Sequence, residues 1–147
     1  MTSLSFILSA ITIIIALFYS LKNRSWLFLL ISFCTLCGAV CLLLNPVLLF
    51  SHGLALIIIG IGTYLFLACT ASESNRLKWT RVTFLLLAMS PFLFKWAQWP
   101  GAELLLFSFI PCTLCFIFLF FERRRLDEQP FYELGICLLI LGFWTLP

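Results

Sequence analysis

The chain has 147 residues, of which 63% are hydrophobic and only 10% are charged, and its mean hydropathy is +1.16. A soluble domain with this composition would expose large apolar patches, whereas a bilayer accommodates helices that are apolar on every side. The composition therefore excludes an ordinary soluble enzyme, and it predicts an all-α, polytopic transmembrane helical bundle with short loops, formed by a single domain of residues 1–147.

Six apolar runs follow one another along the chain, each close to the length of about 20 residues that spans a bilayer as a helix. The predicted spans are residues 3–21, 26–44, 46–70, 82–96, 101–121 and 130–147. The first run has no basic residue before it, unlike a secretory signal peptide, so we interpret it as a retained span.

Prolines mark several of these borders. Pro46, Pro100 and Pro130 stand at the expected starts of spans, where proline fits because the first helical position needs no backbone N–H. Pro91 and Pro111 fall inside the fourth and fifth spans, where we expect kinks.

The basic residues define an orientation. Alternate loops, residues 22–25, 71–81 and 122–129, contain eight of the nine Lys and Arg residues, and the other side receives only Lys95. The eight are Lys22, Arg24, Arg76, Lys78, Arg81, Arg123, Arg124 and Arg125. By the positive-inside rule these loops are cytoplasmic and both termini are non-cytoplasmic. The net charge of +3 then reflects contact with lipid headgroups and gives no indication of nucleic-acid binding.

The acidic residues also fit the borders of the spans. Four are expected in cytoplasmic loops, paired with arginines in solvent: Glu73, Glu122, Asp127 and Glu128. Glu103 and Glu133 are expected in the first turns of spans five and six, where a helix N-terminus favours an acid. The sequence thus predicts no ionisable side chain at mid-membrane, which argues against ion-driven work.

Seven cysteines raise the alternative of redox chemistry, because the sequence CTLC occurs at residues 34–37 and again at 112–115. Both copies fall within apolar spans, where a thiolate would be strongly desolvated, so we expect these thiols to act as small apolar side chains. The only histidine, His52, is too far from them for zinc. The sequence predicts no catalytic set, no metal site and no cofactor.

The same repetition has a second interpretation. The two CTLC copies lie in spans two and five, which cross the membrane in opposite directions. A three-plus-three inverted repeat, as found in many transporter folds, would place them in this way.

A polar and aromatic stretch, FKWAQWPGAELLL at residues 94–106, separates the fourth and fifth spans. It resembles the FKxxHWPGA membrane hairpin of Bacteroidota proteins in the GldL family of gliding-motility and type IX secretion motor subunits. The motif and interface residues are Phe94, Lys95, Trp99, Pro100, Gly101, Ala102 and Glu103. The resemblance covers spans four and five, and it implies a bacterial inner membrane and a related hairpin.

Two departures separate this chain from that family. Gln98 replaces the family's histidine, and Thr113 stands where the resemblance aligns the motor's membrane glutamate. The resemblance therefore implies the hairpin without the energy-coupling group. The glycine and proline spacing of spans two to five is also faintly similar to HdeD-like six-span proteins.

Three functions follow from these patterns. The first is a non-enzymatic inner-membrane subunit or accessory of a larger assembly, or a homo-oligomer, docking through its helices or through a basic patch of Arg123, Arg124 and Arg125. The second is a small transporter or oligomeric pore for a small or lipid-like substrate. The third is a membrane thiol oxidoreductase. In the second, the candidate path-lining residues are Ser90, Ser108 and Thr113.

Overall fold

The computed structural model describes residues 2–44, 50–98, 107–123 and 128–144. These ranges are helical apart from short connections, and they contain six α-helices. The helices are α1 (Thr2–Lys22), α2 (Trp26–Leu44), α3 (Phe50–Thr70), α4 (Asn75–Trp96), α5 (Phe109–Arg123) and α6 (Glu128–Trp144). The first four are long and apolar enough to span a membrane, while α6 contains a shorter apolar segment and α5 has 15 described residues. The all-α prediction is confirmed.

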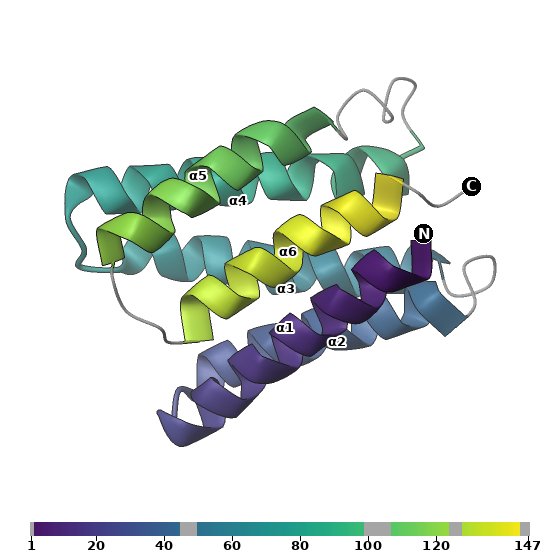
Figure 1. Cartoon of the computed structure of the whole chain (residues 1–147), viewed down its shortest axis with the longest axis horizontal. Helices are drawn as coiled ribbons and strands as arrows, with labels where there is room; N and C mark the ends of the chain where they lie inside the picture. Colours follow the sequence, from purple (N-terminus) through teal and green to yellow (C-terminus); the bar gives the residue numbers. More distant parts are fainter. Residues whose placement is uncertain (1, 45–49, 99–106, 124–127, 145–147) are drawn as a thin grey trace.

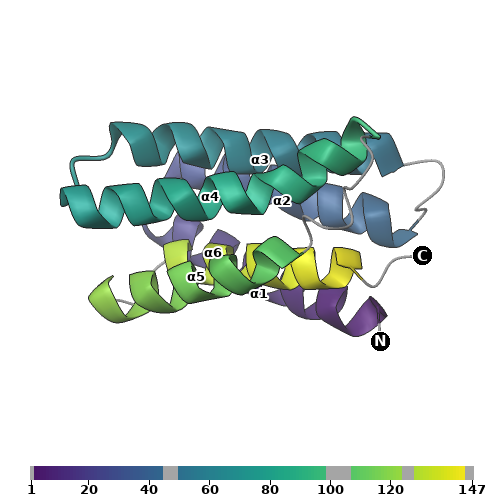
Figure 2. The ribbon, with the colours of Figure 1, turned by 90° about the horizontal axis from the view of Figure 1, so that it is seen from above.

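Most predicted borders of the spans agree with the borders of the helices, but the predicted start of the fourth span was wrong. We expected it at residue 82, and α4 begins at Asn75. The polar residues of the predicted loop instead form two turns of helix, which place Arg81 inside the bundle. Pro91 lies within α4 as expected, and the last turns of α4 bend relative to the rest (Figure 2).

The helices form two layers of three (Figures 1 and 2). One layer has the order α5, α6, α1, and the other has the order α4, α3, α2. The layers are joined at their edges because α4 packs against α5 and α1 packs against α2. The start of α1 and the end of α6 lie at the same end of the bundle, opposite the connections from α1 to α2 and from α3 to α4 (Figure 1).

The helix order does not match an inverted repeat of α1–α3 and α4–α6. The six helices follow one another around the bundle, so exchanging α1 with α4, α2 with α5 and α3 with α6 is a half-turn about the bundle axis, yet it also reverses the direction of every helix (Figure 1). No rotation does both, whereas the halves of an inverted repeat are related by a two-fold axis in the membrane plane. The first helices of the two halves nevertheless end alike. Arg24 follows α1 and Gln98 follows α4 at the same spacing, and each has φ 54°, the left-handed conformation that closes a helix C-terminus.

Small residues bring α2 and α3 close together. A Cβ on Gly38 would lie 2.7 Å from the carbonyl oxygen of Gly53, and one on Gly60 would overlap the hydroxyl of Thr35. Gly38 and Gly60 therefore permit the close approach of the two helices. Gly62, by contrast, has open space around its Cα and faces away from the neighbouring helices.

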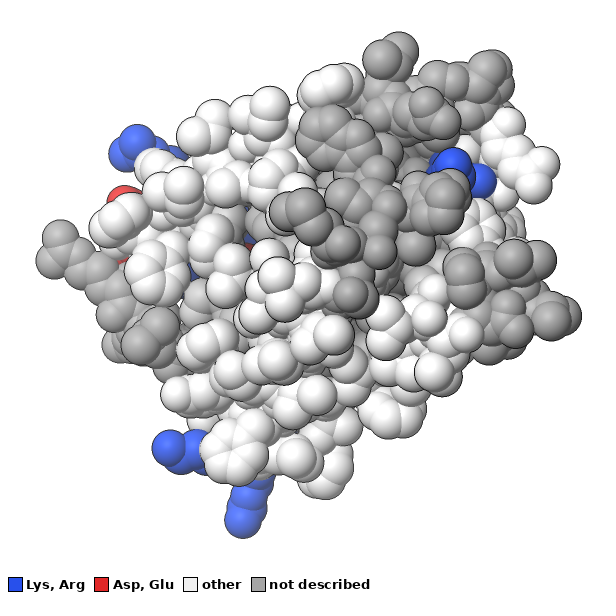
Figure 3. Space-filling model, turned by 45° about the vertical axis from the view of Figure 1, so that its right-hand side comes forward, with Lys and Arg blue, Asp and Glu red and all other residues white. Residues whose placement is uncertain are grey.

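The outer surface is apolar along most of the length of the helices. Large side chains such as Phe18, Phe66 and Phe121 are two-thirds exposed, as expected for side chains that face lipid. On the face shown in Figure 3, the prominent Lys and Arg side chains lie toward the ends of the molecule, with other residues between them. Trp26 and Trp79 are exposed at the end that carries most of the basic residues, in agreement with an interfacial role.

Candidate functional site: a buried ion cluster and its pocket

The bundle contains a cluster of charged side chains that the sequence did not predict. Arg81 has only 2% of its surface exposed, although it was expected in a solvated loop. It is the seventh residue of α4, about 9 Å along the helix at a rise of 1.5 Å per residue. It lies on the same helical face as Leu85, Ala88 and Phe92, all of which are fully buried, so the inward face of α4 continues through the arginine.

Glu133 is the acidic centre of the cluster. It has 1% of its surface exposed and lies in the second turn of α6, so the prediction that it caps the first turn was wrong. Its Oε1 atom accepts a hydrogen bond of 2.8 Å from the hydroxyl of Tyr64 and lies 3.6 Å from Nε of Arg81. A buried carboxylate is costly unless charges and donors surround it, and here both do.

Arg123, the last residue of α5, completes the cluster. Its Nη1 atom lies 3.6 Å from Oε1 of Glu133, and its side chain is 9% exposed. We expected Arg123 in a basic patch on the surface together with Arg124 and Arg125. That expectation was wrong for Arg123, which turns inward to the buried carboxylate; the other two arginines lie outside the described residues.

Glu73 is the member of the cluster nearest to water. Its Oε2 atom lies 2.8 Å from Nη2 of Arg81, and its side chain is 29% exposed. The prediction that it pairs with an arginine is confirmed, but the partner is a buried arginine. Two arginines and two glutamates therefore balance one another within this cluster.

Aromatic rings surround the cluster on the side of the membrane interior. Tyr64 meets Phe28 and Tyr132 edge to face, with ring centroids 5.2 and 5.3 Å apart. The hydroxyl of Tyr132 is 2.7 Å from that of Thr35 on α2. Both tyrosine hydroxyls therefore have polar partners in an otherwise apolar core, and together they connect α2, α3 and α6 at one level.

A pocket of about 340 Å³ opens beside the cluster. Its polar wall includes the charged side chains of Arg81 and Glu73, and its apolar wall includes Phe28, Leu67 and Ala68. The remaining lining residues are Ser25, Tyr64, Thr70, Ala71 and Gln129. They come from the start of α2, the end of α3 and the start of α6, so the pocket lies at the end of the bundle that carries most of the basic residues.

The described part of the FKWAQWPGA motif, residues 94–98, lies at the opposite end. Phe94 and Lys95 belong to the last turn of α4, where Phe94 is half-buried and Lys95 is exposed. The indole N–H of Trp96 donates to the hydroxyl of Ser51, 3.3 Å away. The rest of the motif, Trp99 to Glu103, lies outside the described residues.

The predicted path-lining residues are not part of this pocket. The hydroxyls of Ser90 and Thr113 donate to carbonyl oxygens of their own helices, those of Leu87 and Phe109. Ser108 is half-buried. None of the three lies in the wall that contains Arg81 and Glu73.

The cysteines lie in apolar surroundings. Cys112 and Cys137 are buried, and the thiol of Cys112 is 3.8 Å from the carbonyl oxygen of Phe84. Cys34, Cys37 and Cys115 are half-buried. In the ranges that the structure describes, all cysteines are free and no group of three metal-binding side chains occurs.

The structure thus brings together residues that the sequence placed in one loop and two different spans. Arg81, Glu133 and Tyr64 come from three helices, and a pair of opposite charges remains at the pocket wall. Such a site can bind a polar or charged group at the end of a membrane bundle. Comparison with protein families, with curated proteins and with solved structures finds no match to this chain.

Proposed function

We propose that the protein is a non-enzymatic, six-span carrier of the bacterial cytoplasmic membrane that binds a small or lipid-like substrate in the pocket beside Arg81. The observation that carries this proposal is the pocket itself, with a buried arginine and a partly exposed glutamate in its wall. Ionisable side chains inside a membrane bundle are costly, and they commonly mark substrate pathways.

The contacts at the two ends of the described bundle support the same proposal. The pocket beside Arg81 lies at the end that carries most of the basic residues. At the other end, the ring of Phe143 packs against the rings of Phe50 and Phe92.

The two ends therefore correspond to an open and a closed gate. With the basic loops on the cytoplasmic side and both termini outside, the pocket faces the cytoplasm. The aromatic residues at the far end close the pathway until the layers move relative to each other.

Reconstitution in liposomes tests the proposal. A fluorescent phosphatidylethanolamine in both leaflets is exposed to a membrane-impermeant quencher, which bleaches only the outer leaflet unless the lipid crosses. The protein should extend bleaching to the inner leaflet, and Ala71→Phe should abolish this effect because Ala71 lines the pocket. Equal bleaching with the protein, with Ala71→Phe and with empty liposomes would contradict a carrier function.

A subunit role is the second candidate, and the exposure of α5 favours it. Of its 15 residues, only Cys112 and Leu119 are buried, while Ile110, Leu114 and Phe121 are strongly exposed. A partner helix or a second copy of the chain could cover this face. Purification in mild detergent tests this role, because a single monomeric species without a companion protein would contradict it.

A further inference from the structure

The pocket wall holds one positive and one negative side chain in direct contact. Nη2 of Arg81 and Oε2 of Glu73 are 2.8 Å apart. Both atoms are buried, and within the described residues neither has a hydrogen-bond partner besides this ion pair. The Nε atom of Arg81 likewise has none there, since Oε1 of Glu133 lies 3.6 Å away. A buried guanidinium with unsatisfied donors is a strong site for an anionic oxygen.

We propose that this pocket binds the zwitterionic headgroup of an aminophospholipid, with its phosphate at Arg81 and its ammonium group at Glu73. This inference rests on the proposed carrier function and names its substrate class. The ligand inserts between Arg81 and Glu73, which otherwise form an ion pair with each other.

The charges around the pocket favour a zwitterion over a simple anion. Arg123 and Arg81 both contact Glu133, and Glu73 balances the remaining charge. A ligand with only negative charge would displace Glu73 from Arg81 and leave its carboxylate unpaired. In a zwitterion, the phosphate replaces Glu73 as the anionic partner of Arg81, and the ammonium group replaces Arg81 as the cationic partner of Glu73. No charge is then left uncompensated.

The nature of the two side chains refines the choice of headgroup. Guanidinium groups bind phosphate oxygens through two parallel N–H donors. A carboxylate accepts hydrogen bonds, and a primary ammonium group provides three donors, whereas the quaternary ammonium group of choline provides none. Glu73 therefore selects ethanolamine over choline.

The position of the pocket favours a lipid over a free headgroup. The charged side chains are near the helix ends, where the headgroups of a bilayer lie. Phe28, Leu67 and Ala68 form an apolar wall of the same pocket, and Thr70 and Gln129 add polar groups at the helix ends. This wall can cover the glycerol backbone and the first methylene groups, which a soluble phosphate compound lacks.

Binding to the purified full-length chain in mild detergent tests the inference. Short-chain phosphatidylethanolamine, phosphatidylcholine and phosphatidylglycerol are titrated separately, with free phosphoethanolamine and inorganic phosphate as soluble competitors. We expect the ethanolamine lipid to bind about tenfold or more tightly than the other two lipids, the difference that one charge-assisted hydrogen bond provides. Phosphoethanolamine should compete weakly, and inorganic phosphate should not compete at the same concentration.

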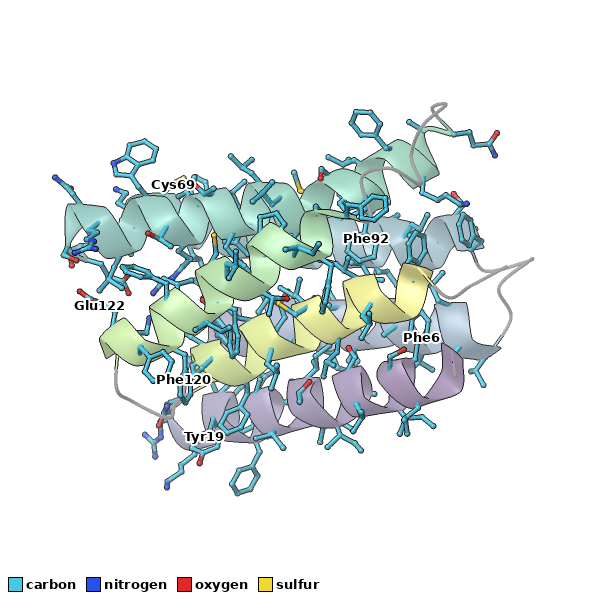
Figure 4. The ribbon with its side chains drawn as sticks, turned by 45° about the horizontal axis from the view of Figure 1, so that its top comes forward. Phe6, Tyr19, Cys69, Phe92, Phe120 and Glu122 are labelled. Atoms are coloured by element: carbon cyan, nitrogen blue, oxygen red, sulfur yellow. The ribbon has the colours of Figure 1, made fainter. Side chains whose placement is uncertain are left out.

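Two matched variants assign the preference to Glu73. Glu73→Gln should bind the ethanolamine lipid no better than the glycerol lipid, because the amide does not pair with the ammonium group. Glu122→Gln removes the same charge at the same end of the bundle (Figure 4). This exposed side chain does not line the pocket, so the preference should persist.

The outcomes separate the headgroup from the carrier function. Equal affinity for all three lipids, or a preference that survives in Glu73→Gln, would overturn the zwitterion assignment. In that case inhibition of lipid flux by Ala71→Phe would still support a carrier. Tighter binding of phosphoethanolamine than of the lipid would assign the site to a soluble compound and overturn the lipid assignment.

Discussion

Different contacts hold the helices together at the two ends of the bundle. At one end Glu133 on α6 meets Tyr64 on α3 and Arg81 on α4. At the other end Phe143 on α6 meets Phe50 on α3 and Phe92 on α4, with centroid distances of 6.1 and 5.3 Å. The same three helices thus meet twice, once through charges and once through aromatic rings.

This difference determines what each end needs in order to open. Aromatic rings fit together by shape, and lipid covers their exposed edges at little cost. Charged side chains in a bundle need each other, because a single unpaired charge in an apolar surrounding is strongly unfavourable. A ligand of matching charge can therefore replace the contacts at the charged end, whereas the aromatic end can separate without leaving a charge unpaired.

Removing the carboxylate of Glu133 should cause the largest loss of stability. In Glu133→Leu, Arg81 retains Glu73, but Arg123 and the hydroxyl of Tyr64 lose the atom that they share. We expect the free energy of unfolding to fall by about 3–5 kcal/mol, as for other broken buried ion pairs. Unfolding by sodium dodecyl sulfate in mixed micelles, followed by circular dichroism, measures this loss.

The matched control is Glu122→Leu, an exposed acid at the same end, which should change stability by less than about 0.5 kcal/mol. The paired variant Arg123→Met with Glu133→Leu should recover much of the loss, because the cation that lost its carboxylate is then removed as well and Arg81 keeps Glu73. Equal stability of the Glu133 and Glu122 variants would show that the cluster contributes nothing to the fold.

The sequence predicted the helices far better than the cluster. Apolar runs and prolines located α2 to the residue and α6 within a few residues. These are local signals, since the length of an apolar run and the position of proline depend on neighbours in the chain. The distribution of the basic residues along the chain likewise distinguishes the two ends of the bundle, because alternate loops lie at the same end.

The cluster was missed because hydropathy assigns a charge near a membrane border to a loop, as for Arg81, or to the first turn of a span, as for Glu133. Arg81 and Glu133 are far apart in the sequence, and their pairing depends on the packing of α4 against α6. One signal was present: Arg81 continues the helical spacing of Leu85, Ala88 and Phe92, which form the buried face of α4. A charged residue in register with a buried face predicts a buried partner, and that rule would have identified Arg81 but not Glu133.

The hydroxyl of Tyr64 provides a smaller and more specific test of the charged end. Tyr64→Phe removes a hydrogen bond to a carboxylate, which typically contributes about 1.5–3 kcal/mol. Tyr132→Phe removes a hydroxyl of the same kind from the neutral Thr35, at a cost of about 0.5–1.5 kcal/mol. The same unfolding assay compares the two variants, and a larger loss in Tyr132→Phe would contradict a charged Glu133.

The aromatic end should give the smallest effect. Phe143→Leu retains an apolar side chain but removes the ring contacts with Phe50 and Phe92, so we expect a loss of about 1 kcal/mol. Phe66→Leu is the control, since that ring is 68% exposed on α3 and should be nearly neutral. A loss in Phe143→Leu as large as that in Glu133→Leu would mean that both ends depend equally on specific contacts, and the distinction between the charged end and the aromatic end would fail.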